Sequence, residues 1–320
     1  MSVYLEEHAA GVREAAQRIK PYIRRTPSLT TDLDPDLRLK AECFQVTGSF
    51  KARGAFNAIL MLAAQKPRPA GVITVSSGNH AQAVALAAAT VGLPALVLIP
   101  ENANPAKVAA TRALGAEVIQ EGVTFANRED RMREEMERRE LTLVHPFDDW
   151  NVIHGQGTAC LELIQDDPEL RVVVTPVGGG GLLSGTAISA KSHDASIRVV
   201  GVEPAQADDA YRSWKAGSIQ VLATAPDTMA DGVRTMSIGT RTFDAMFANG
   251  LVDEIVTVTE EEIASAVRVA WSRLHLALEP TGALPLAAYL AGKLPPGRTG
   301  LILTGGNANL ETVATLLSHQ

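Results

Sequence analysis

The sequence of 320 residues is 46% hydrophobic and 20% charged, and its formal net charge is −7. This length and composition are typical of a globular chain with two domains or one large α/β unit, and the negative charge argues against a nucleic-acid partner. No run reaches the roughly 20 apolar residues of a membrane span, and no signal peptide is visible, so no membrane partner is expected. Cys43 and Cys160 lie far apart in the sequence and form no metal-ligand spacing, which argues against a zinc site. Two lone thiols are typical of a protein in a reducing cytoplasm.

The N-terminal part begins with an amphipathic helix over 8–20 and an alternating strand over 37–42. A turn at 47–49 then leads into a helix from about Phe50 to Ala64, with Ser49 as its expected N-cap. Further short apolar strands are expected over 71–75, 96–99, 117–119, 172–174, 197–202 and 300–303. Further helices are expected over 81–90, 105–114, 125–140, about 155–163, 182–190, 260–278 and 284–291. Strands that alternate with helices predict an α/β fold with parallel sheets and crossover helices.

Three small or glycine-rich loops each follow a predicted strand, at 76–80, 178–181 and 304–307. In an open α/β sheet such loops line the crevice at the carboxyl ends of the strands, where ligands bind. The loop at 76–80 opens a helix and suits an anion, although an ordinary strand-to-helix turn also fits it. The four glycines at 178–181 favour a phosphate cradle, because flexible linkers are not normally placed between a Val-rich strand and a Leu-rich helix. They match neither a Walker loop nor a clean GxGxxG fingerprint.

Lys51 lies at the start of the helix that follows the 47–49 turn. A lysine alone is most often a solvated surface charge. A lysine together with a phosphate cradle and a carboxylate-binding loop indicates a cofactor that carries both a phosphate and an aldehyde. Pyridoxal 5′-phosphate (PLP) has both groups.

Seven segments in order then resemble one enzyme family, the PLP-dependent serine/threonine dehydratases (threonine ammonia-lyases) and serine racemases of fold type II. They are 48–55, 76–80, 178–181, 201–204, 230–233, 279–281 and 305–307, and the resemblance runs from about Pro21 to Leu310. It implies two open, twisted, mostly parallel sheets flanked by helices. A large PLP-binding domain would comprise 1–65 and 149–320, and a small inserted domain 66–148. It also implies a homodimer, and no C-terminal regulatory domain or feedback by isoleucine is expected after Asn307.

The resemblance assigns roles around the cofactor. Lys51 would hold PLP as a Schiff base and then act as the base at the substrate Cα, and Phe50 would pack against the pyridine ring. Asn79 would hydrogen-bond the ring hydroxyl. Thr304 would face the ring nitrogen, where a hydroxyl favours loss of a β-leaving group over transamination. The phosphate would bind the amides of Gly178, Gly179, Gly180 and Gly181.

The resemblance also assigns substrate and metal ligands. The substrate carboxylate would bind the N–H groups of the loop formed by Ser76, Ser77, Gly78, Asn79 and His80. Arg128 and Asp231 match positions near the substrate in the racemases, although a surface helix charge and a helix cap would also explain them. A divalent cation, Mg²⁺ or another, would bind Glu203, the Ala207 carbonyl and Asp209, whereas solvated loop acids are the alternative from the residues alone.

The expected reaction is the dehydration and deamination of L-threonine or L-serine, small β-hydroxy amino acids, to 2-oxobutanoate or pyruvate and ammonia. Racemisation of serine or aspartate is the nearest alternative, and it needs a second acid/base on the opposite ring face, where Ser77 occupies the family position. Dehydration of 3-hydroxyaspartate is a third option. A non-catalytic ligand-binding homologue would be expected to lack Lys51 or the glycine cradle, and both are present.

Overall fold

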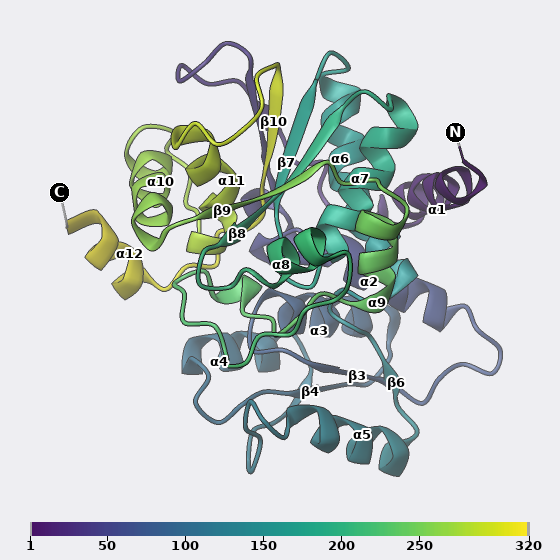
Figure 1. Ribbon diagram of the computed structural model, residues 1–320. Coiled ribbons are helices and arrows are strands. Elements are labelled where there is room, and N and C mark those ends of the chain that lie inside the picture. Colours follow the sequence, from purple (N-terminus) through teal and green to yellow (C-terminus); the bar gives the residue numbers. More distant parts are fainter. Residues whose placement is uncertain (1, 319–320) are drawn as a thin grey trace.

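The computed structural model describes residues 2–318, which form two open, mostly parallel sheets flanked by helices, as the sequence predicts (Figure 1). The larger sheet has the strand order β1 (Ser28–Leu29), β2 (Leu37–Ala41), β10 (Thr299–Leu303), β7 (Val172–Pro176), β8 (Arg198–Pro204) and β9 (Glu254–Val258). In this sheet β1 pairs antiparallel with β2, and the other neighbours are parallel. The smaller sheet is parallel, in the order β5 (Glu117–Ile119), β4 (Ala95–Leu98), β3 (Val72–Val75) and β6 (Thr142–Leu143).

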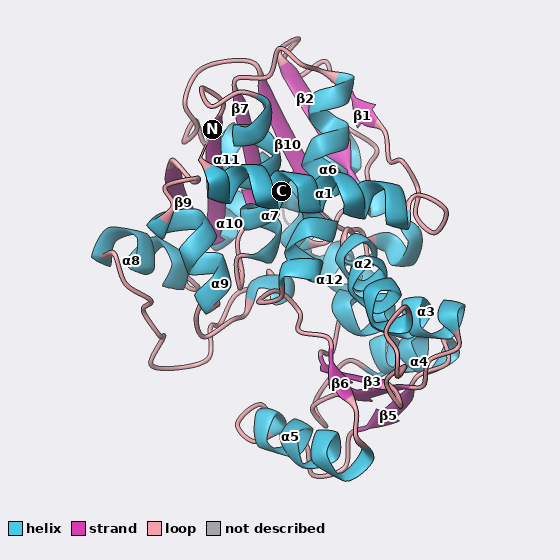
Figure 2. Cartoon of the chain, turned by 90° about the vertical axis from the view of Figure 1, so that its right-hand side faces the viewer, coloured by secondary structure: helices cyan, strands magenta, loops and turns pink. Residues whose placement is uncertain are grey.

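Helices cover both sheets and fill the space between them. Those of the first half are α1 (Val3–Ile19), α2 (Lys51–Ala63), α3 (Asn79–Val91), α4 (Pro105–Ala113), α5 (Arg128–Arg139) and α6 (Trp150–Asp166). Those of the second half are α7 (Gly181–His193), α8 (Asp209–Ala216), α9 (Thr240–Phe243), α10 (Glu260–Ser272), α11 (Pro280–Leu290) and α12 (Leu310–Ser318). Helix α2 packs on α6 on one side and on α3 on the other, so it joins the two sheets (Figure 2). Among the described residues, no helix has both the length and the apolar character needed to cross a bilayer.

The central strands of the larger sheet are buried on both faces. In β7, Val173 joins the apolar cluster under α1, α6 and α7, whereas Val172 and Val174 join the cluster under α10 and α11. In β10, Ile302 faces the first cluster, and its two neighbours face the second. This alternation follows from the two-residue period of a strand, and continuous apolar runs are typical of parallel strands covered by helices on both sides.

Several expected boundaries were wrong. Ser49 does not cap α2, because it is buried in an extended conformation and forms a bridge with Gly305. Helix α6 begins five residues before Gly155, since the Asp149 carboxylate accepts hydrogen bonds from the first amides of that helix. Helix α10 ends at Ser272 rather than at residue 278. The sequence patterns did not predict β1, β9, α8, α9 or α12.

Candidate active site

The segment that carries Lys51 is paired with the segment that follows β10. The Phe50 amide donates to the Thr304 carbonyl at 3.0 Å, and the Gly306 amide donates to the Gly48 carbonyl at 3.0 Å. The bridge between Ser49 and Gly305 lies between these two hydrogen bonds. Lys51 and Thr304, which the family resemblance assigns to one cofactor, therefore lie on adjacent backbone segments, although they are far apart in the sequence.

A strained turn at Thr47 and Gly48 precedes the segment that carries Lys51. Thr47 has φ 61°, which is uncommon for a β-branched residue, and Gly48 follows with φ 72°. A Cβ at Gly48 would lie 2.3 Å from Asn307 Oδ1, so glycine is needed here for space as well as for conformation. Strain of this kind persists only where surrounding contacts fix it, and it concentrates at functional sites.

The Lys51 side chain is half-buried. Its Nζ donates to the Pro146 carbonyl at 3.0 Å and lies 5.2 Å from the centroid of the Phe50 ring. Burial lowers the pKa of Lys51 to about 8, and the nearby Glu279 carboxylate opposes part of this effect. A substantial fraction of the amine is therefore neutral close to physiological pH, as a nucleophile or a general base requires.

Asn79, the first residue of α3, lies in a network of polar side chains. Its Nδ2 donates to Glu279 Oε1 at 2.7 Å, and its Oδ1 accepts from Asn307 Nδ2 at 2.8 Å. Asn307 Nδ2 also donates to the Thr47 carbonyl at 2.7 Å, which links Asn79 to the lysine turn. Burial raises the pKa of Glu279 to about 7. Sequence reasoning did not include Glu279 in the site, although it lies in the motif 279–281.

The glycine loop connects β7 to α7 as expected. Among residues 2–318, the amides of Gly178, Gly179 and Gly180 donate to no protein acceptor. A Cβ at Gly179 would meet the Phe147 ring at 2.2 Å, so glycine lets this ring lie directly on the loop. Since Phe147 directly follows Pro146, one short segment contacts both the glycine loop and the Lys51 amine.

Buried polar groups without partners fit PLP at this place. The Thr304 hydroxyl is buried and makes no hydrogen bond within the described part of the chain, so it is available to a ring nitrogen. The free amides of the glycine loop suit a phosphate, and Lys51 can bond to an aldehyde. Buried polar groups are normally satisfied, and a bound cofactor would satisfy these.

The loop between β3 and α3 offers several free amides. In the described chain the backbone N–H groups of Ser77, Asn79 and His80 have no protein acceptor, whereas Ser76 N donates to the Leu98 carbonyl and Gly78 N to the Ser76 hydroxyl. The Ser77 residue is exposed. The His80 ring is buried with Nε2 at 3.1 Å from the Val144 carbonyl, and burial lowers its pKa to about 3. The backbone N–H of His80 is therefore available to a ligand of the loop, while the neutral, buried ring is held by its contact with the Val144 carbonyl.

Arg128 and Asp231 lie at two separate contacts between the segment 223–236 and the helices that flank the smaller sheet. Arg128 is the first residue of α5; its guanidinium stacks 3.5 Å from the Phe125 ring centroid and lines a pocket of about 470 Å³ that also includes Met236. Asp231 is exposed, and its carboxylate pairs with Lys107 Nζ of α4 at 2.5 Å. The two residues do not pair with each other.

The predicted cation ligands lie where β8 ends and α8 begins. The Glu203 carboxylate accepts from the amides of Ala210 and Tyr211 at 3.1 and 2.8 Å. Both carboxylate oxygens of Asp209 are buried without a partner in residues 2–318, and burial raises the pKa of Asp209 to about 7 and that of Glu203 well above its ordinary value. No group of three or more His, Cys, Asp or Glu side chains suited to a metal occurs in that range, so a carbonyl such as that of Ala207 would have to complete the set.

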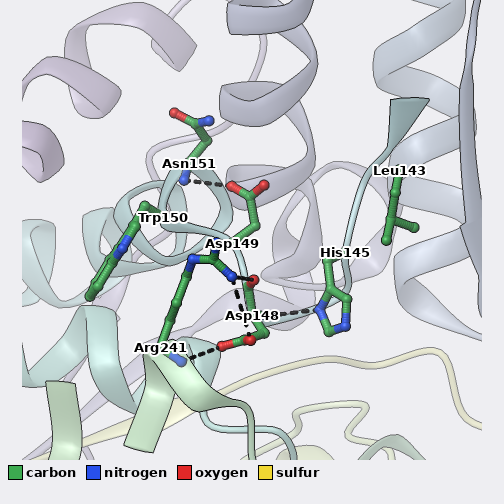
Figure 3. Close-up of a pocket in the computed structure, with 7 residues that line it drawn as sticks. All are labelled: Leu143, His145, Asp148, Asp149, Trp150, Asn151 and Arg241. Carbon is green, nitrogen blue, oxygen red and sulfur yellow. Dashed lines mark hydrogen bonds and ion pairs between the residues drawn. The ribbon is translucent and has the colours of Figure 1, made fainter. Parts of the chain in front are cut away.

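A second pocket, of about 400 Å³, lies beside the Pro146–Phe147 segment (Figure 3). Figure 3 shows Asp148 between His145 and Arg241: its amide donates to His145 Nδ1 at 2.8 Å, and its Oδ1 accepts from the Arg241 amide at 2.8 Å. None of the predicted site residues lines this pocket. These hydrogen bonds fix the segment that contacts Lys51, so the pocket flanks the site.

Comparison with known proteins identifies the family of the chain. Residues 19–305 match the family model described as pyridoxal-phosphate dependent enzyme. The serine racemase of Dictyostelium discoideum is 41% identical, with 96% of this chain and 97% of that protein covered. The L-threo-3-hydroxyaspartate ammonia-lyase of Saccharomyces cerevisiae is 40% identical, covering 96% of this chain and 95% of that protein.

Among solved structures, a threonine deaminase from T.th. is 48% identical and superimposes with a TM-score of 0.88, covering 94% of this chain and 98% of that one. The relatives thus include both racemases and ammonia-lyases. The chain belongs to the fold type II PLP-dependent enzymes, in the family of the serine racemases, threonine deaminases and hydroxyaspartate ammonia-lyases.

Proposed function

We propose that this enzyme catalyses β-elimination from L-threonine, L-serine or both, and releases 2-oxobutanoate or pyruvate and ammonia. The lowered pKa of the Lys51 amine is the observation that supports this reaction best, together with the Thr304 hydroxyl, which has no partner in residues 2–318 and lies on the backbone segment bonded to Phe50. A neutral amine can remove a Cα proton, and a hydroxyl at the ring nitrogen does not favour a protonated ring. The similarity to a threonine deaminase supports the same reaction.

When bound, PLP supplies the electron sink for charge at the substrate Cα. Lys51 would hold the cofactor, and its neutral Nζ would accept the Cα proton of the substrate. Phe50 would pack against the ring, and Asn79 would bind its hydroxyl. The amides of 178–181 would hold the phosphate, and the free amides of the loop 76–80 would orient the substrate carboxylate. Arg128 and Asp231 would lie near the substrate.

Racemisation is the second candidate. The exposed Ser77 lies in the loop proposed to bind the substrate carboxylate, where a hydroxyl can deliver a proton to the opposite face of Cα. The similarity to serine racemases supports this candidate, as the similarity to L-threo-3-hydroxyaspartate ammonia-lyases supports hydroxyaspartate as a substrate.

A panel assay separates these reactions. Purified enzyme is supplied with L-threonine, L-serine, L-aspartate and 3-hydroxyaspartate, with and without Mg²⁺, while keto acid, ammonia and D-amino acid are measured. We expect keto acid from threonine or serine to exceed D-serine. Predominant D-serine formation would reject elimination as the main reaction. Lys51→Ala should lose both the visible absorbance of bound PLP and turnover, and turnover retained in this variant would reject the assigned role of Lys51.

The proposal also includes a cation and the organisation of the chain. Glu203, the Ala207 carbonyl and Asp209 would hold Mg²⁺ or another divalent cation, which would neutralise the two buried carboxylates. We propose a large domain of 1–65 and 149–320 and a small domain of 66–148, which correspond to the two sheets. A homodimer in the cytoplasm remains our expectation for the assembled enzyme.

A further inference from the structure

The side chain of Glu279 does not serve the helix at whose start it lies. Glu279 is the N-cap residue of α11, with Pro280 as the first helical residue, and it makes no side-chain capping hydrogen bond. An acidic N-cap normally accepts from the second or third amide of its helix. Here Oε1 accepts from Asn79 Nδ2 instead, and the residue is only 3% exposed. A cap therefore does not explain why this acid is buried.

The partners of Asn79 fix the orientation of its amide. A backbone carbonyl can only accept a hydrogen bond, and an amide NH₂ group can only donate. The Thr47 carbonyl therefore requires Nδ2 of Asn307 on its side, and this Nδ2 in turn requires Oδ1 of Asn79. Nδ2 of Asn79 then donates to Glu279 Oε1, and a flipped Asn79 would place nitrogen against nitrogen at Asn307. In the observed orientation one Nδ2 hydrogen of Asn79 remains for another acceptor.

Glu279 and Asn307, the two partners of Asn79, are both linked to the backbone segment that carries Lys51. The Glu279 amide donates to the Gly305 carbonyl at 3.1 Å, and Gly305 forms the bridge with Ser49, two residues before Lys51. Asn307 reaches the same turn through the Thr47 carbonyl. Asn79, in contrast, follows β3 of the smaller sheet. The two hydrogen bonds therefore set the start of α3 relative to the lysine segment.

We propose, on the basis of the cofactor site proposed above, that Glu279 and Asn307 are positioning residues that aim the free Nδ2 hydrogen of Asn79 at the ring hydroxyl of PLP. Glu279 acts through Asn79. It follows that a change at Glu279 alters how the ring is bound only while the Asn79 amide is present.

A double-mutant cycle on cofactor binding tests this dependence. Apoenzyme of the wild type, Glu279→Ala, Asn79→Ala and the double variant is titrated with PLP, and the affinity and the absorbance maximum of bound PLP are recorded. We expect each single variant to weaken binding about tenfold, as loss of one hydrogen bond to a charged or aligned group does. The double variant should bind within about twofold of Asn79→Ala, because a positioning residue has no effect once the group it positions is gone.

Two further variants provide matched controls. Glu279→Gln keeps an oxygen that accepts from Asn79 and should restore affinity to within about threefold of the wild type. Asn307→Ala removes the other restraint and should shift the absorbance maximum in the same direction as Glu279→Ala. If Glu279→Ala does not fold, Glu279→Gln and Asn307→Ala, each alone and combined with Asn79→Ala, take its place in the cycle.

Effects that multiply in the double variant, or a Glu279→Gln affinity as poor as that of Glu279→Ala, would overturn the inference. These titrations need no turnover. A wild-type enzyme that binds PLP as described but releases no keto acid would reject the proposed lyase reaction and leave the positioning role standing.

Discussion

The carbonyl oxygen of Pro146 accepts a hydrogen bond from Lys51 Nζ at 3.0 Å, and this contact fixes the position of the half-buried amine. Because burial disfavours the charged amine, the pKa of Lys51 falls to about 8, and the neutral form grows as pH rises through that value. The environment of the lysine therefore prepares it for bond formation before any ligand arrives.

The rate at which apoenzyme takes up PLP should consequently depend on pH. Only the neutral amine attacks an aldehyde, so we expect the rate to increase with pH and to reach half of its plateau near pH 8. Stopped-flow absorbance measures it, and n-butylamine with PLP over the same range gives the titration of an ordinary, solvated amine. A midpoint near that of butylamine would contradict the effect of burial.

Arg53 should be important for stability, although it lies only two residues from Lys51. Its fully buried guanidinium contacts Glu42, which is also fully buried, at 2.8 Å and Glu162 at 2.8 Å. Removal of one partner from a buried ion pair leaves an uncompensated charge, so Arg53→Met should lower the free energy of unfolding by about 3–5 kcal/mol. Urea denaturation followed by circular dichroism measures this.

The control for this prediction is Arg133→Met in α5, where the arginine side chain is 63% exposed and its partner Asp130 75% exposed. An exposed pair contributes little, so this variant should change the free energy of unfolding by less than about 1 kcal/mol. Equal losses of unfolding free energy in the two arginine variants would show that the buried pairs of Arg53 with Glu42 and Glu162 stabilise the protein no more than an exposed pair does.

Mg²⁺ should stabilise the protein through Glu203 and Asp209. A ligand that binds only the folded state stabilises it by about 2.7 kcal/mol at a hundred times its dissociation constant, so the thermal midpoint should rise with added Mg²⁺. The variant with Glu203→Gln and Asp209→Asn should lose this response, whereas Glu129→Gln with Asp130→Asn, at an exposed acidic pair in α5, should keep it. A Mg²⁺ shift that survives the first double variant would place the cation elsewhere.

Local signals in the sequence predicted much of the fold. Helix α10 starts at residue 260 as predicted, and Thr259 and Glu262 exchange the two hydrogen bonds of a capping box there. Helix α4 likewise starts at residue 105 as predicted, with Asn104 as its N-cap. Ser49 failed because a tertiary contact, the bridge to Gly305, outcompeted the local preference of serine for a cap.

The site was predictable only as far as motifs reveal chemistry. Within residues 2–318, the glycine-loop amides and the Thr304 hydroxyl lack protein partners, which agrees with what their residue types suggest, and their roles are proposals. Glu279 could not be placed in this way. The sequence predicted the helix only from residue 284, which left Glu279 in the preceding connection, and only the three-dimensional contact with Asn79 reveals its use.

The position of β10 has a consequence for how the protein matures. It is the last strand in sequence, yet it lies in the interior of the larger sheet between β2 and β7. Its end supplies the backbone to which the lysine turn is bonded. During synthesis, β2 and β7 leave the ribosome long before β10, so the larger sheet cannot be completed until the last strand has been made. We therefore expect the PLP site, which uses the end of β10, to form late in folding.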